Sequence, residues 1–240
     1  MNGILYGVGA GPGDPELITV KGLRLLQQAP VVAFPAGLRG KLGVAQQIVG
    51  SWLRPEQYLL PLEFPYVQDD AVLVAAWQRA AETVWEFLRL EKDVVFVSEG
   101  DVSFYSTFTY LAQTLQQFHA EAQVEVVPGI SSPMAAAAAL GIPLTVRSQR
   151  LTILPALYTV ADLETAIAHA EVVVLMKVSS VYEQVWKILH KHQLLQHSYV
   201  VERATQPNQV IYADLRDRPH LQLPYFSLLI VQKMGSEDLT

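Results

Sequence analysis

The sequence predicts an α/β protein of two domains, a parallel-sheet N-terminal domain followed by a mixed-sheet C-terminal domain. Up to about residue 140, short apolar runs alternate with longer segments of helical apolar spacing, which is typical of parallel strands joined by helices. Beyond residue 145 the apolar runs follow one another more closely, with two convincing helical segments between them. Such spacing favours antiparallel or mixed pairing. We therefore expect domains at residues 1–145 and 146–240.

The first domain is predicted to begin with a buried strand that ends in a glycine-rich loop. Pro15 suits the first turn of the helix that follows, and Glu16 favours its positive end. Asp69 and Asp70 are predicted to cap a long helix that reaches Leu88. The strands expected here are 3–8, 31–34, 93–101 and 124–129, and the other helices are 17–26, 43–53, 104–118 and 131–140.

The second domain is predicted to be richer in strands. Runs of Val, Ile, Leu and Tyr mark its strands, and apolar residues at helical spacing mark its helices. The strands expected are 151–158, 172–177, 199–204, 210–215 and 225–233, with helices at 162–168 and 181–192.

Composition indicates a well-packed globular protein and excludes several functions. Of 240 residues, 51% are hydrophobic and 17% are charged, which argues against disorder. The net charge of −6 argues against a nucleic-acid partner, and the absence of cysteine excludes disulfides, thiolate metal sites and a cysteine nucleophile. The N-terminus lacks a basic segment and the longest apolar run is too short to span a bilayer. We expect a cytoplasmic protein without a membrane partner.

The stretch GVGAGPGDP, residues 7–15, raises the question of a phosphate cradle. Dinucleotide-binding loops need glycines at i, i+2 and i+5, and every register fails here. No Gly-Lys-Ser/Thr follows, and Asp14 and Glu16 are unsuited to holding phosphate. Two interpretations stay open: a plain strand-to-helix turn, or a loop built for close backbone approach to a ligand without phosphate.

Two more predicted strand ends carry unusual residues. VSEGDVSFYSTF (97–108) contains Asp101, and PGISS (128–132) contains Ser131 and Ser132. Because the carboxyl ends of parallel strands share one rim, the three loops are expected to form a polar pocket for a small ligand with a positive centre. The alternatives are that Asp101 caps the helix near Phe104, and that the two serines cap the next helix.

No metal site is expected. His190 and His192 resemble a ligand pair, but residues at i and i+2 do not share a helix face. A solvated helix surface explains both histidines better.

Taken together, these motifs resemble those of the tetrapyrrole methylase family. GAGPGDPELITVKG, SEGD with YSTF, and PGISS before an alanine-rich helix occur in the family's order, followed by LMK (175–177) and VERAT (201–205). The resemblance covers nearly the whole chain. It implies methyl transfer from S-adenosylmethionine to a small-molecule tetrapyrrole, with both bound in a cleft between two domains, and a homodimer.

Stretches such as LEFPYVQDD (62–70) and PYFSLLIVQK (224–233) resemble one branch of this family most. That branch methylates C20 of precorrin-2 or cobalt-factor II in cobalamin biosynthesis. The uroporphyrinogen branch has an acidic residue where this chain has Pro35, which argues against that branch. Two alternatives remain: another acceptor, such as uroporphyrinogen III or a later precorrin, or a non-catalytic carrier of tetrapyrrole or cofactor.

The resemblance also implies roles for individual residues. Glu99 departs from the glycine-glycine-aspartate turn of the uroporphyrinogen branch. The cofactor-binding positions are Pro12, Glu99, Gly100, Asp101, Phe104, Ser131, Ser132, Met176 and Ala204. Asp101 and Tyr105 are the catalytic candidates, because the methylated carbon must lose a proton. The substrate is a polycarboxylate, which arginine and lysine suit. The substrate-binding candidates are Gly11, Asp14, Arg39, Lys41, Arg147 and Lys177, with Arg150 as a further basic residue.

Overall fold

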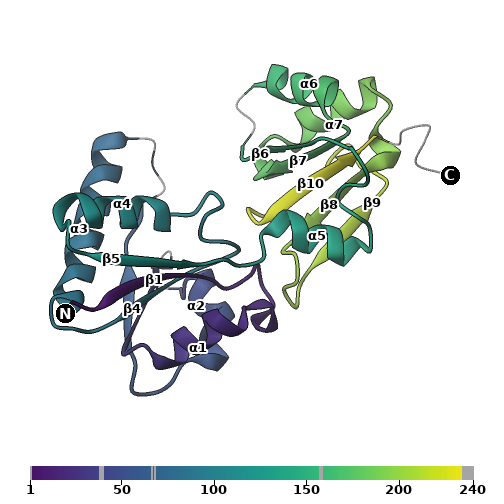
Figure 1. The fold of residues 1–240 in the computed structure, drawn as a ribbon. Helices are drawn as coiled ribbons and strands as arrows, with labels where there is room; N and C mark the ends of the chain where they lie inside the picture. Colours follow the sequence, from purple (N-terminus) through teal and green to yellow (C-terminus); the bar gives the residue numbers. More distant parts are fainter. Residues whose placement is uncertain (1, 38–40, 66, 68, 157–158, 234–240) are drawn as a thin grey trace. The chain divides into compact units, whose positions relative to one another are not determined.

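A computed structural model describes residues 2–37, 41–65, 67, 69–156 and 159–233 (Figure 1). The chain forms two compact units, divided between Ser131 and Ser132. The predicted division after residue 145 differs, because helix α5 (Ser132–Leu140) packs on the second sheet. The Gln232 side-chain amide of that sheet also donates to the carbonyl oxygen of Pro143 at 2.6 Å. These contacts assign the segment after Ser131 to the second unit.

The first unit contains a five-stranded sheet in the order β3-β2-β4-β1-β5, and every pair is parallel. This confirms the predicted parallel sheet. Gly9 lies opposite Ser98, and Val8 lies opposite Val127, so the carboxyl ends of three strands are level. The strands are β1 (Ile4–Gly9), β2 (Val31–Pro35), β3 (Tyr58–Leu62), β4 (Val94–Ser98) and β5 (Gln123–Val127).

Helices cover both faces of this sheet (Figure 1). Side chains alternate along β2, so Val31 faces one helix layer and Val32 the other. Strands buried on both faces need continuous apolar runs, which the sequence shows. One layer holds α3 (Asp70–Leu88) and α4 (Phe108–Phe118), and the other holds α1 (Val20–Gln28) and α2 (Val44–Val49), with short helices η1 (Pro15–Leu17) and η3 (Gly50–Trp52). Among the described helices, none has the length and apolar character needed to cross a bilayer.

The second unit contains a mixed sheet in the order β6-β7-β10-β8-β9. Only β6 and β7 pair in parallel, and the other three pairs are antiparallel, which confirms the predicted mixed sheet. Helices α6 (Val160–His169) and α7 (Tyr182–Lys191) cover one face (Figure 1). The strands are β6 (Leu151–Leu154), β7 (Val172–Met176), β8 (Ser198–Glu202), β9 (Val210–Ala213) and β10 (Ser227–Gln232), with short helices η4 (Val178–Ser180) and η5 (Leu195–His197).

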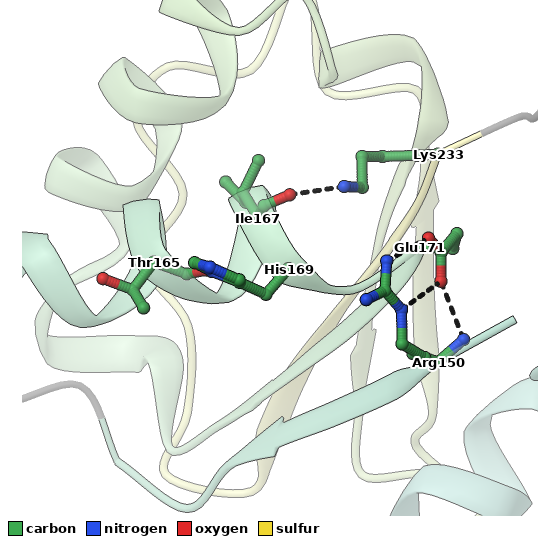
Figure 2. Close-up of polar contacts among 6 residues, drawn as sticks. All are labelled: Arg150, Thr165, Ile167, His169, Glu171 and Lys233. Carbon is green, nitrogen blue, oxygen red and sulfur yellow. Dashed lines mark hydrogen bonds and ion pairs between the residues drawn. The ribbon is translucent and has the colours of Figure 1, made fainter.

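Glu171 fastens the end of this sheet where β6 and β7 begin (Figure 2). Its carboxylate accepts hydrogen bonds from the Arg150 backbone N–H at 2.8 Å and from the Arg150 guanidinium at 2.9 Å. Its carbonyl accepts from the Lys233 N–H at 2.8 Å, and the Lys233 ammonium donates to the Ile167 carbonyl. The hydrogen bonds from Arg150 lower the pKa of Glu171 to about 2. The Arg150 guanidinium is thus ion-paired with Glu171.

Candidate functional site

The loops after β1 and β4 are joined by backbone hydrogen bonds at the carboxyl edge of the first sheet. The Gly11 N–H donates to the Gly100 carbonyl at 3.1 Å, and the Gly100 N–H donates back to the Gly11 carbonyl at 2.8 Å. Both residues have positive φ, +79° and +71°. Only glycine adopts this conformation without strain, so the bridge explains one glycine in GAGPGD, Gly11, and one in SEGD, Gly100.

Asp101 connects the loop after β4 to the loop after β5. Its Oδ2 accepts a hydrogen bond from the Gly129 N–H at 2.7 Å, and its Oδ1 accepts from the N–H and the hydroxyl of Ser103, the N–H at 2.8 Å. Burial raises the pKa of Asp101, but these hydrogen bonds outweigh it and hold the pKa below its usual value. The carboxylate therefore holds two loops together and is a weak proton acceptor.

Three backbones pass so closely at this edge that side chains are excluded. A Cβ on Gly129 would lie 2.3 Å from the Gly100 carbonyl oxygen, and a Cβ on Gly9 would lie 2.7 Å from the Gly129 Cα. Gly9, Gly129 and Ser103 were absent from the candidate residues derived from the sequence. The signal for the two glycines was their position in loops predicted to share one rim.

The segment between Asp101 and α4 is a loop, and the helix begins at Phe108, later than predicted. Ser98 Oγ and Ser106 Oγ are 2.9 Å apart, and Ser106 Oγ accepts from the Phe108 N–H at 3.2 Å. Asp101 therefore does not cap α4. The rings of Phe104 and Tyr105 project from this loop with centroids 4.7 Å apart. Tyr105 is 58% exposed, so its phenol is accessible.

The structure brings most of the first unit's candidate residues to this edge. Pro12 and Glu99 are half-buried in the joined loops. Ser131 follows Gly129 closely, and Ser132 is the first residue of α5, where the second unit begins. These residues share the rim that the sequence predicted.

Two further described candidates of the first unit lie in the segments that follow β1 and β2. Asp14 caps η1 by accepting from the Glu16 N–H at 2.8 Å. Lys41 is exposed in the chain between β2 and α2, and Arg39 lies outside the described residues. Pro35 ends β2 at the carboxyl edge of the same sheet. The Pro15 carbonyl accepts from the Trp52 indole N–H at 3.3 Å, which braces the loop after β1.

In the second unit, Met176 and Ala204 lie at one edge of the mixed sheet. Met176 ends β7, and Ala204 follows the end of β8. Strand β10 separates them, with Leu228 opposite both Met176 and Val201. Ala204 is buried and Met176 half-buried.

Two basic candidates of the second unit lie on different elements. Lys177 is exposed next to Met176, with φ at +53°. Arg147 is exposed in the chain between α5 and β6.

The histidines of α7 have separate neighbours. The His190 ring stacks on Trp186 with centroids 5.1 Å apart, and His192 Nε2 lies 3.8 Å from a Glu164 carboxylate oxygen. Within the described ranges, no group of three or more His, Cys, Asp or Glu residues is placed to hold a metal ion. Nothing in this geometry links His190 and His192 to one ion.

Comparisons with known proteins agree with the motifs. Residues 4–218 match the model of the family described as Tetrapyrrole (Corrin/Porphyrin) Methylases. The chain is 32% identical to the cobalt-precorrin-2 C(20)-methyltransferase of Salmonella typhimurium, covering 97% of this chain and 98% of the relative. It is 34% identical to the precorrin-2 C(20)-methyltransferase of a Sinorhizobium species, covering 95% of each.

A solved structure has the same fold. The structure of uroporphyrin-III C-methyltransferase from Thermus thermophilus, complexed with S-adenosyl homocysteine, matches with a TM-score of 0.67 and 24% identity. The match covers 96% of this chain and 97% of that one. At this identity the likeness concerns the fold.

Proposed function

The chain belongs to the tetrapyrrole methylase family, and we propose that it transfers a methyl group from S-adenosylmethionine to C20 of precorrin-2 or of its cobalt complex, in cobalamin biosynthesis. The observation that carries the proposal is similarity along the whole chain, at 32% and 34% identity, to relatives named for this reaction. Pro35 at the end of β2 also separates the chain from the uroporphyrinogen branch.

The residues at the carboxyl edge of the first sheet fit S-adenosylmethionine. The N–H and carbonyl groups of Gly11 and Gly100 bond to each other, and the lack of a side chain at Gly100 leaves room for a ligand beside this bridge. A Cβ at Gly100 would make only an ordinary van der Waals contact, with the Ile130 carbonyl oxygen at 3.9 Å. The Ser131 Cα would lie 4.0 Å from the same Cβ. We assign cofactor contacts to the residues that the family resemblance indicates: Pro12, Glu99, Gly100, Asp101, Phe104, Ser131, Ser132, Met176 and Ala204.

When bound, S-adenosylmethionine supplies a methyl group on a positively charged sulfur. The protein's main contribution is to orient the acceptor carbon and exclude water, which contributes up to about 7–11 kcal/mol in well-oriented reactions. Asp101 serves this orientation by holding the loops after β4 and β5 together. Lys41, Arg147 and Lys177 are the described basic residues proposed to pair with substrate carboxylates, and Gly11 and Asp14 are the other proposed substrate-binding residues.

Tyr105 is proposed to relay the proton that leaves the methylated carbon: its hydroxyl oxygen accepts that proton while its own O–H proton passes to water. Tyr105 is exposed, where water can take the relayed proton, whereas both oxygens of Asp101 accept hydrogen bonds and the Asp101 pKa is lowered. A carboxylate with a lowered pKa is a weaker base. We therefore propose Asp101 as a positioning residue rather than as the base expected from the sequence.

The test is a methyl-transfer assay with S-adenosylmethionine and either metal-free precorrin-2 or its cobalt complex, with the product masses measured. A gain of one methyl group on one of the two substrates supports the proposal and identifies the metal state. Cofactor binding without transfer to either substrate contradicts it and points to another acceptor or a carrier.

Three finer expectations belong to the same proposal. The first is a cytoplasmic protein, the second is a homodimer, and the third is that cofactor and substrate bind between the two units. Light scattering of the purified protein tests the second expectation. Crystals grown with S-adenosylhomocysteine test the third.

A further inference from the structure

We propose that Lys177, Arg203, Tyr225 and Phe226, which we call the β10 rim, bind the acceptor tetrapyrrole through its carboxylates and its flat face. The proposal rests on the proposed function, because it names the surface that recognises the substrate of that reaction. Arg203, Tyr225 and Phe226 were not among the residues that the sequence suggested.

The register of the second sheet places two cations on either side of the start of β10. The Arg203 N–H donates to the Phe226 carbonyl at 2.7 Å, so Arg203 lies beside this strand on the β8 side. Leu228 pairs with Met176, so Lys177 lies beside the same strand on the β7 side. Neighbouring strands are about 4.8 Å apart, which separates the two backbones by roughly 10 Å. Two carboxylates on one macrocycle can span such a distance.

Two exposed aromatic rings lie between these cations in the sheet order. Tyr225 is 48% exposed and Phe226 is 38% exposed, with their ring centroids 5.1 Å apart. The Lys177 ammonium lies 5.9 Å from the centre of the Tyr225 ring. Exposed aromatic side chains next to cations suit a ligand that is flat, apolar on its faces and negatively charged at its edge.

Glu202 orients the Arg203 side chain. Glu202 is 5% exposed, and one of its carboxylate oxygens accepts from the Arg203 guanidinium at 3.2 Å. A guanidinium has five N–H donors in a planar fork, more than this contact uses. Arg203 is 30% exposed at its side chain, so it is held in place and still accessible to a carboxylate.

The backbone at this edge is strained where the cations are attached. Lys177, Arg203 and Thr205 have φ of 53°, 48° and 66°. Residues with a Cβ rarely adopt this conformation, and such residues cluster at ligand-binding sites. The strain therefore agrees with a binding role for the edge.

Charge favours the tetrapyrrole over the cofactor as the occupant of the β10 rim. S-adenosylmethionine carries a positive sulfonium, which two nearby cations would repel. A tetrapyrrole polycarboxylate offers several negative groups around a flat ring. The opposite assignment, in which the aromatic rings hold the adenine of the cofactor, is an outcome that the experiment separates.

The experiment measures uroporphyrin binding by fluorescence and S-adenosylhomocysteine binding by calorimetry, on the full chain. The variants are Lys177→Met, Tyr225→Ala, Arg203→Gln and Arg203→Lys, the last because it keeps a charge beside buried Glu202 if Arg203→Gln fails to fold. The controls are Lys187→Met, on the exposed surface of α7, and Arg54→Gln, whose partner Glu56 lies at 3.2 Å.

We expect Lys177→Met and Arg203→Gln to weaken uroporphyrin binding by about tenfold, as for a lost charged hydrogen bond. Tyr225→Ala should weaken it through the lost ring contact, and Arg203→Lys through the lost planar fork. All four variants should leave S-adenosylhomocysteine binding unchanged. Both controls should bind both ligands like the wild type. Added salt should weaken wild-type uroporphyrin binding more than that of Lys177→Met.

Three results overturn the proposal: a wild type that binds no uroporphyrin, rim variants that bind it normally, or rim variants that lose S-adenosylhomocysteine instead. The methyl-transfer assay separates this proposal from the proposed function. Uroporphyrin binding that depends on the rim, without any methyl transfer, supports the β10 rim as a binding surface and contradicts the proposed reaction. Methyl transfer with an unchanged KM for precorrin-2 in the rim variants supports the proposed reaction and contradicts the β10 rim as the substrate-binding surface.

Discussion

Asp101 Oδ2 accepts a hydrogen bond from the Gly129 backbone N–H at 2.7 Å, which joins two loops that are 28 residues apart in the sequence. With the bridge between Gly11 and Gly100, this contact makes the loops after β1, β4 and β5 one connected surface. The proposed methyl transfer depends on that surface keeping its shape, because misplaced reactants react slowly.

Asp101→Asn should lower both stability and cofactor affinity. The amide removes one acceptor and turns an N–H toward another donor, at a cost of about 1–3 kcal/mol in the free energy of unfolding. Urea unfolding and S-adenosylhomocysteine calorimetry measure the two effects. Asp93→Asn is the matched control, because Asp93 Oδ1 accepts from the Ile4 N–H at 2.8 Å, where β1 and β4 begin. Asp93→Asn should bind S-adenosylhomocysteine with the affinity of the wild type. Normal affinity in Asp101→Asn would contradict the role of Asp101 in joining the loops after β4 and β5.

Gly129→Ala should be severely destabilising, by about 1–3 kcal/mol or more, since the new methyl group would collide with the Gly100 carbonyl. Thermal unfolding measures the loss. Gly50→Ala is the comparison, because a Cβ there has nothing within 4 Å and the backbone is helical, with φ at −54°. That variant should be neutral or slightly stabilising. Equal melting temperatures for the two variants would refute the close packing of the three loops.

Tyr105→Phe should lower kcat by about 10²- to 10⁴-fold, because phenylalanine has no hydroxyl to relay the departing proton to water. Affinity for S-adenosylhomocysteine and the melting temperature should not change, because the side chain is exposed. Tyr110→Phe, whose ring stacks on Trp77 with centroids 4.4 Å apart, is the control. A Tyr105→Phe enzyme with normal turnover would remove Tyr105 from the mechanism.

Glu171→Gln should reduce the loss of folding stability that occurs as the pH falls. The pKa of Glu171 is lowered to about 2 in the folded protein, against about 4.3 in an unfolded chain. Glu171 therefore contributes stability that is fully present above about pH 4.3 and is lost as the pH falls toward about 2. Denaturant midpoints across this range measure the slope, which Glu171→Gln should reduce. Arg150→Gln should reduce it equally, and the double variant should add little. Additive losses would show that the pair is not coupled.

Regular elements were largely predictable because their apolar periodicity is local. The buried strands β1, β2 and β4 read as continuous apolar runs, and Asp69 marked the start of α3 by accepting from two backbone N–H groups. Strand β3 was missed, since it is a sheet edge whose side chains are largely exposed and it contains Pro61. The predicted start of α4 at Phe104 is too early, because the apolar aromatic residues of the preceding loop continue the helical spacing of α4.

The site was predictable as a set of loops but not as a set of contacts. Strand polarity brings the ends of β1, β4 and β5 together, so the rim followed from the predicted topology. The hydrogen bonds of Asp101 and the approach of Gly9 to Gly129 depend on residues distant in sequence. No local pattern encodes them. For the same reason the sequence alone does not single out Arg203 and Tyr225, which the strand register places at one edge.

The most direct test of the central claim is to locate the transferred methyl group. Purified protein is incubated with S-adenosylmethionine carrying a carbon-13 methyl group and with metal-free precorrin-2 or its cobalt complex, and the product is analysed by NMR. We predict a single labelled methyl group, bonded to C20 of one of these substrates. A label at another carbon, or no label on either while S-adenosylhomocysteine still binds, would contradict the assignment.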